Sequence, residues 1–171
     1  MKPLLLGLTA LTLPLLASAE TDELVDASDA ERIVSILQDE GFKAELTKGE
    51  NDQLLIRSGA SGVDFHISFT ACGGAAKVCE VLSFSAGFDF EYGKKPSDLS
   101  NWNQNKWTKA YLDAENDPFL EHNVNMLHGV SEANFRDTLN WYARELGRFV
   151  DYIGWNDSKS APDMDPDIKP I

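Results

Sequence analysis

Two runs of alternating residues on either side of two cysteines constrain the fold of this chain most. Residues 63–70 read VDFHISFT, and residues 80–88 read EVLSFSAGF. In both runs apolar residues occupy every second position, as in a strand with one buried face. An antiparallel register that places Cys72 opposite Cys79 brings the two side chains within reach of a bridge. The sequence therefore predicts a β-hairpin with one apolar face.

The first nineteen residues have the pattern of a secretory signal peptide. Lys2 gives a short positive start, Leu4 to Leu16 is uncharged and apolar, and Ala17 to Ala19 has the small residues that a signal peptidase needs. A membrane anchor is the alternative, but a run of about 13 residues gives a helix of roughly 20 Å, against about 30 Å of hydrocarbon. We expect cleavage after Ala19, a periplasmic or secreted protein, and no stable membrane insertion after cleavage.

The predicted export decides between three interpretations of Cys72 and Cys79. Thiols pair in an oxidising compartment. A zinc site would need two further ligands, and the sequence has no Cys or His pair at zinc-finger spacing. A redox pair would have the spacing C-x-x-C at the start of a helix. We therefore expect a structural disulfide, which closes a loop of about eight residues and stabilises the fold by about 2.5 kcal/mol.

The charge balance limits the classes of partner. The chain has a formal net charge of −13, and removal of Lys2 with the leader makes it one unit more negative. Nucleic acid and anionic membranes are disfavoured, because binding to phosphate depends on Lys and Arg. The charge favours a cationic partner or simply keeps the protein soluble, and solubility is the simpler explanation.

The other patterns complete an α+β domain. Ser28 and Glu31 form a capping box before a helix over 29–40, and Ser97 is the expected cap of a helix that begins at Pro96. Apolar residues at helical spacing from Phe135 to Ile153 predict a long helix whose stripe faces the sheet or a partner. Further strands are predicted over residues 42–47, 54–58, 107–113 and 119–126.

The resulting order is α-β-β-β-β-α-β-β-α. Strand runs between helices predict an antiparallel sheet with flanking helices. This domain should span residues 20–157, after a signal peptide over residues 1–19. Residues 158–171 contain three prolines, alternating charge and little to bury, and are predicted to form a disordered tail.

No motif in the sequence predicts a catalytic, cofactor or metal site. The three histidines, His66, His122 and His128, match no metal-ligand spacing. The acidic group from Asp113 to Asp117 lacks the glycine and the final glutamate of a calcium loop, and it is typical of a hairpin turn. We therefore expect no catalytic residues, no metal and no cofactor.

The segment LSNWNQNKWTKAYLD is the candidate binding surface, through Trp102, Asn103, Trp107 and Tyr111. On this hypothesis a rim of aromatic and polar side chains grips a ligand or an extended peptide. The alternative, which we favour, is that Trp102 packs on the sheet while the amides cap the end of the helix and turn the chain.

Three stretches resemble the YbjN domain family: GVDFHISFTACGG with CEVLSFSAGFDF, LSNWNQNKWTKAYLDAENDPFLEHNVNM, and GVSEANFRDTLNWYARELGRFVDYI. The resemblance covers roughly residues 24–155. Members are described as bacterial sensory transduction regulators, and the fold is similar to that of type III secretion chaperones, small acidic α+β proteins that often dimerise and bind extended segments. The resemblance implies a binding or regulatory module and carries over no catalytic residues.

These observations lead to three functional hypotheses. The first is an exported, non-enzymatic binding or regulatory module, with a chaperone-like form in which a strand edge binds a protein or peptide. The second is a small periplasmic enzyme of unknown reaction, built around His66 or His122 and a nearby carboxylate. The third is a homodimeric structural domain in which the stripe of the long helix pairs with that of a second copy.

Overall fold

A computed structural model describes residues 23–49, 52–73 and 78–160. In chain order the elements are β1 (Leu24–Val25), α1 (Ala30–Asp39), β2 (Lys43–Lys48), β3 (Leu54–Ala60), β4 (Val63–Gly73), β5 (Val78–Gly87), α2 (Pro96–Asn105), β6 (Lys109–Leu112), β7 (Pro118–Asn125), β8 (Val130–Ser131), α3 (Glu132–Tyr152) and α4 (Trp155–Ser160). The predicted order of helices and strands is confirmed, with β1, β8 and α4 as additional short elements. The predicted signal peptide lies outside the described residues.

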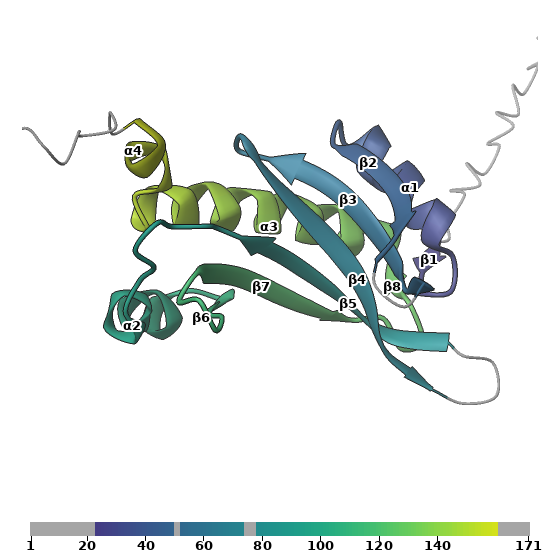
Figure 1. Cartoon of the computed structure of the whole chain (residues 1–171). Helices are drawn as coiled ribbons and strands as arrows, with labels where there is room; N and C mark the ends of the chain where they lie inside the picture. The colour runs from purple at the N-terminus through teal and green to yellow at the C-terminus, as the bar shows by residue number, and fades with distance from the viewer. Residues whose placement is uncertain (1–22, 50–51, 74–77, 161–171) are drawn as a thin grey trace, which may run out of the picture.

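Six strands form one antiparallel sheet in the order β2-β3-β4-β5-β7-β6. Strands β2 to β5 follow one another as a meander, whereas β7 pairs with β5 and places β6 at the far edge. Strands β1 and β8 form a separate two-stranded sheet. Figure 1 shows α3 crossing one face of the large sheet, with α1 beside β2 and α2 beside β6. The α+β class with an antiparallel sheet and flanking helices is confirmed.

The core lies between the large sheet and the helices. Ile56, Ile67 and Phe84 stand opposite one another on β3, β4 and β5, and all three are fully buried. The predicted stripe of α3 is buried too, with Tyr142 packed edge-on against Phe65 of the sheet. The stripe therefore faces the sheet of its own chain, and it is not available for pairing with a second copy.

The predicted disulfide between Cys72 and Cys79 is confirmed. The two residues are opposite each other in the antiparallel register of β4 and β5, as the alternating pattern requires. Both lie beyond the last pairing of β5 with β7, at Val81 and Asn125. The bridge therefore closes a two-stranded ribbon that extends past the rest of the sheet (Figure 1).

Two predicted helix caps were wrong. Asp29 caps α1 by accepting a hydrogen bond from the Arg32 N–H (2.9 Å), because the Ser28 N–H and hydroxyl both donate to Asp26 instead. The helix α2 begins one residue before the predicted cap.

At the start of α2, Pro96 occupies the first helical position, where its missing N–H costs nothing. Lys95 is therefore the N-cap residue, and its N–H donates to the Asp98 carboxylate (2.9 Å). Ser97 lies inside the first turn and has no capping role.

Two further boundaries shift. The strand predicted from residue 107 begins at Lys109. The disordered tail was predicted to begin at residue 158, but α4 continues to Ser160. The rest of the predicted tail, residues 161–171, lies outside the described residues. Within the described part of the chain, no helix combines the length and apolar character needed to cross a membrane.

Candidate functional site: the open face of the sheet

The second face of the large sheet carries polar side chains. Because side chains alternate along a strand, each residue next to a core position points to this opposite face. One row of paired residues crosses all six strands: Glu45, Arg57, His66, Ser85, Glu121 and Lys109. Cationic and anionic side chains thus stand in register across the whole width of the sheet. We call this surface the open face.

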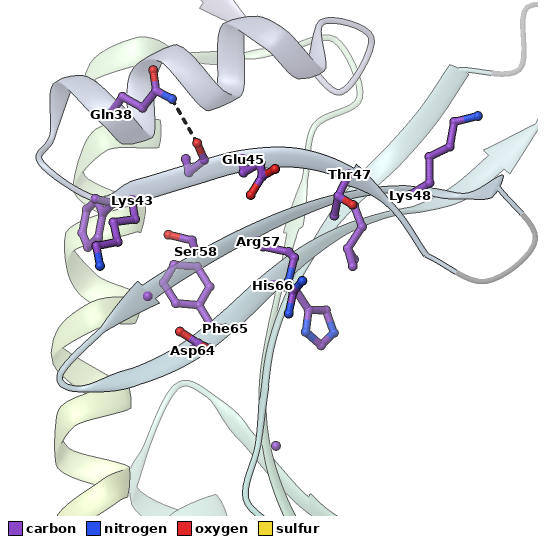
Figure 2. A pocket seen from close by; sticks show the side chains of 15 residues that line it. Gln38, Lys43, Glu45, Thr47, Lys48, Arg57, Ser58, Asp64, Phe65 and His66 are labelled. Carbon is purple, nitrogen blue, oxygen red and sulfur yellow. Dashed lines mark hydrogen bonds between the residues drawn. The ribbon is translucent and has the colours of Figure 1, made fainter.

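One end of the open face is hollowed. A cavity of about 860 Å³ lies over β2, β3 and β4, and its lining includes Lys43, Glu45, Arg57, Asp64 and His66. In Figure 2 Arg57 and His66 point to the same side of the sheet, and Gln38 reaches from α1 to the Ala44 carbonyl. A cavity of this size and position can hold several side chains of a bound segment.

Glycines contribute to the shape of the hollow. Gly59 and Gly87 both line it, and neither has a side chain to fill it. A Cβ atom at position 87 would come within 2.6 Å of the Phe119 ring, which lies on the same face and stacks on Tyr111 with ring centroids 5.4 Å apart. The close approach of Phe119 therefore requires glycine at position 87.

The charges in the hollow are mixed. Lys43, Lys48 and Arg57 are cationic, while Glu45 and Asp64 are anionic. Lys48 forms an ion pair with Asp52 (3.2 Å), whereas Arg57 has no ion pair within the part of the chain that the structure describes. This end of the open face is therefore less acidic than the chain as a whole, whose net charge is −13.

The open face also perturbs two titratable groups. Burial lowers the pKa of His66, and the positive charge of Arg57 lowers it further. Burial raises the pKa of Tyr111, and the negative charge of Glu121 adds to this effect. The lowered pKa favours the neutral form of His66, in which it can both donate and accept a hydrogen bond.

The two candidate catalytic histidines lie on opposite faces of the sheet. His122 pairs with Phe84 in the register of β5 and β7, on the helix-covered face, and burial lowers its pKa. Among the described residues, neither His66 nor His122 makes a hydrogen bond with a carboxylate, and no three His, Cys, Asp or Glu side chains are grouped so that they could hold a metal ion. The arrangement gives no support to a general-base site.

The lowered pKa values of the two histidines predict a pH dependence of stability. As the pH falls through about 6.5, the unfolded chain binds protons before the folded chain does, so stability is lost as the pH falls toward the folded-state pKa. We expect the melting temperature to fall between about pH 7.5 and about pH 5.5. Calorimetry should show a smaller fall for His66→Gln/His122→Gln, whereas His128→Asn, a control at an exposed position, should behave as wild type. An equal fall in all three proteins would contradict this explanation.

Two residues of the predicted binding surface are used inside the fold. Trp102 is only 2 % exposed, and its indole N–H donates to the Thr108 hydroxyl (3.1 Å). The Asn103 amide donates to the Ala110 carbonyl (2.9 Å) and accepts from the Ala110 N–H (2.8 Å), so it fastens α2 to β6. Trp102 is therefore buried, as the favoured alternative expects, but its ring packs on Phe149 of α3, and Asn103 binds the backbone of β6 and does not cap the end of α2.

The other two residues of that surface lie apart. Trp107 is 79 % exposed and contacts Trp141 of α3, with ring centroids 5.9 Å apart. Tyr111 is half-buried on the open face. The four residues therefore do not form one surface. The hollow was missed because its residues come from three strands and carry no motif beyond the alternation of each strand.

A family model described as "putative bacterial sensory transduction regulator" matches residues 29–155. The chain belongs to the YbjN family. The matched YbjN range includes all six strands of the large sheet and the helices α1, α2 and α3. The description is that of a regulator and not of an enzyme family. No curated protein and no solved structure matches the chain, so the expected likeness to type III secretion chaperones stays a prediction.

Proposed function

We propose that this YbjN domain is an exported, non-enzymatic binding module that acts by holding a protein or peptide segment on the open face of its sheet. The observation that carries the proposal is the open face itself, with its hollow of about 860 Å³ over β2, β3 and β4. Its side chains offer hydrogen-bond donors and acceptors of both charges, as the surface of a binding site does.

The chemistry of the hollow supports a binding role over a catalytic one. The side chains that line it include charged groups from three strands, but His66 is paired across the strands with the cation Arg57 and makes no hydrogen bond with the Asp64 carboxylate in the described structure. A general base needs a partner that orients it within hydrogen-bond reach. A binding site needs no such pair, because a hollow with a few polar groups that fix the orientation of the bound segment is sufficient.

Export is the second part of the proposal. The leader over residues 1–19 predicts it, and the disulfide is compatible with an oxidising compartment. The mass of the intact protein purified from the periplasm or medium should correspond to a chain that begins at Glu20. An uncleaved chain recovered from the cytosol would contradict the export but not the binding role.

Site-specific crosslinking in living cells tests the binding role. A photoreactive residue at Thr47, which lines the hollow, should give discrete products, whereas the same residue at Glu31, an exposed position of α1, should not. Arg57→Glu should weaken the products from Thr47. Mass spectrometry then separates a foreign protein from a second copy of the chain. Identical products from Thr47 and Glu31, or none from Thr47, would overturn the proposal.

A further inference from the structure

A second surface lies on α3 and is separate from the open face. Trp107 comes from the connection between α2 and β6, and Trp141, Arg144 and Arg148 follow one another at steps of three and four along α3. Together with Glu145 they enclose a cavity of about 310 Å³. We call the four residues Trp107, Trp141, Arg144 and Arg148 the Trp–Arg patch.

The Trp–Arg patch exposes large apolar groups in an unusual combination with cations. Trp107 and Trp141 are 79 % and 44 % exposed, although their rings contact each other. Fixed aromatic rings next to arginine are typical of surfaces that bind a protein segment. Neither tryptophan belongs to the buried core, so part of each ring is available to a bound segment.

The patch has an excess of positive charge. Arg148 donates to Glu145 Oε1 (2.6 Å), and Glu145 Oε2 has no hydrogen-bond partner in the described part of the chain. Arg144 forms no ion pair with any described residue. The two guanidinium groups therefore outweigh the one carboxylate, in a chain whose net charge is −13. A segment that completes the patch should be acidic.

We propose that residues 161–171 of the same chain bind to the Trp–Arg patch. This segment, which lies outside the described residues, reads APDMDPDIKPI and has Asp163, Asp165 and Asp167 at alternate positions. Alternate residues of an extended chain are about 6.6 Å apart on one side. Arg144 and Arg148 are four residues apart, or about 6 Å along the helix. The spacing of the aspartates thus matches the spacing of the arginines.

The remaining residues of the segment suit the tryptophans. Pro162 and Pro166 flank the first two aspartates, and Met164 and Ile168 are apolar. Proline-containing segments bind to aromatic grooves at low entropic cost, because their extended conformation is largely preset. The composition of the segment therefore suits both the tryptophan rings and the guanidinium groups of the patch.

The connection is long enough for binding within one chain. Eleven residues in extended conformation span about 36 Å. From Trp141 to the end of α3 the helix rises only about 16 Å, and α4 adds about 9 Å. The segment can therefore reach the patch from Ser160. A bound tail would shield the tryptophans, and an acidic segment of another protein would have to displace it.

Photocrosslinking in the full-length, disulfide-bonded protein tests this proposal. A photoreactive residue replaces Met164, and mass spectrometry locates the product. We expect crosslinks to the peptides that contain Trp107 and residues 141–148, on molecules with the mass of a monomer at every protein concentration. Crosslinks that spread over the chain, or that appear only on dimers, would overturn the proposal.

Charge variants give the matched controls. Arg144→Glu/Arg148→Glu should lower the yield of these crosslinks about fivefold, as the loss of two exposed ion pairs predicts. Lys43→Glu/Arg57→Glu, which reverses two charges in the hollow, should leave the yield unchanged. Because charge reversal on α3 could affect folding, Asp163→Asn/Asp165→Asn/Asp167→Asn provides a second test outside the folded domain, with the same expected loss. A yield that no variant changes would contradict the proposal, as would a yield that persists in 1 M salt, where screening acts within about 3 Å.

Discussion

Replacement of Trp102 by alanine should lower the free energy of unfolding by about 4 kcal/mol, the largest effect that we expect from a single substitution. Trp102 is 2 % exposed and packs on Phe149 of α3, with ring centroids 4.9 Å apart. Its loss leaves a cavity between α2 and α3. It also leaves the buried Thr108 hydroxyl without the indole N–H that donates to it. Urea denaturation followed by circular dichroism measures the change.

The chain provides a control of the same residue type. Trp107→Ala removes an indole that is 79 % exposed, and the free energy of unfolding should change by no more than about 0.5 kcal/mol. The sequence places both tryptophans in one candidate surface, and the comparison of the two free energies of unfolding shows which of them supports the fold. If both variants lost the same free energy, Trp102 would not have the structural role that its burial assigns to it.

Removal of the disulfide should have the second largest effect. Cys72→Ser/Cys79→Ser should lower the free energy of unfolding by about 2.5 kcal/mol, because the bridge restricts a loop of about eight residues in the unfolded chain. Reduction of the wild-type protein with a thiol should give the same midpoint as the double variant. The variant itself should be insensitive to the thiol.

Hydrogen exchange adds a local measurement to this prediction. Thr70 pairs with Val81, which also pairs with β7, whereas Cys72 and Cys79 lie beyond β7. In the variant, the amides of the ribbon beyond Val81 should exchange faster than the same amides in the wild type, whereas exchange in the rest of the sheet should change little. The prediction would be wrong if the variant and the wild type had the same exchange rates and the same denaturation midpoint. The pairing of β4 with β5 would then be sufficient to hold the ribbon without the bridge.

The sequence was sufficient to predict the features that depend on local periodicity. The alternation over 63–70 and 80–88 fixes which side chains share a face, and a shift by one residue would turn the whole apolar set outward. For this reason the register that places Cys72 opposite Cys79 could be predicted from the pattern, whereas the prediction of a disulfide also depended on the predicted export. The long helix could be predicted too, since its apolar stripe recurs with helical period over most of its length.

Features that depend on the packing of distant segments could not be predicted in the same way. The position of β7 between β5 and β6 has no local signal, because any of several pairings would bury the same apolar face. The role of Asn103 depends on the nearby backbone of Ala110, which only the folded chain brings into reach. The hollow depends on Arg57 and His66 being opposite each other on neighbouring strands, and each is unremarkable in its own segment.

The contact between Asn103 and Ala110 has a consequence for self-assembly. Asn103 occupies both backbone groups of Ala110 on β6, so this margin of the sheet has little left to offer to another chain. At the opposite margin, Gln38 occupies only the Ala44 carbonyl of β2. We therefore expect strand addition at the β6 margin to be disfavoured, because an added strand would have to displace Asn103 from the backbone of Ala110.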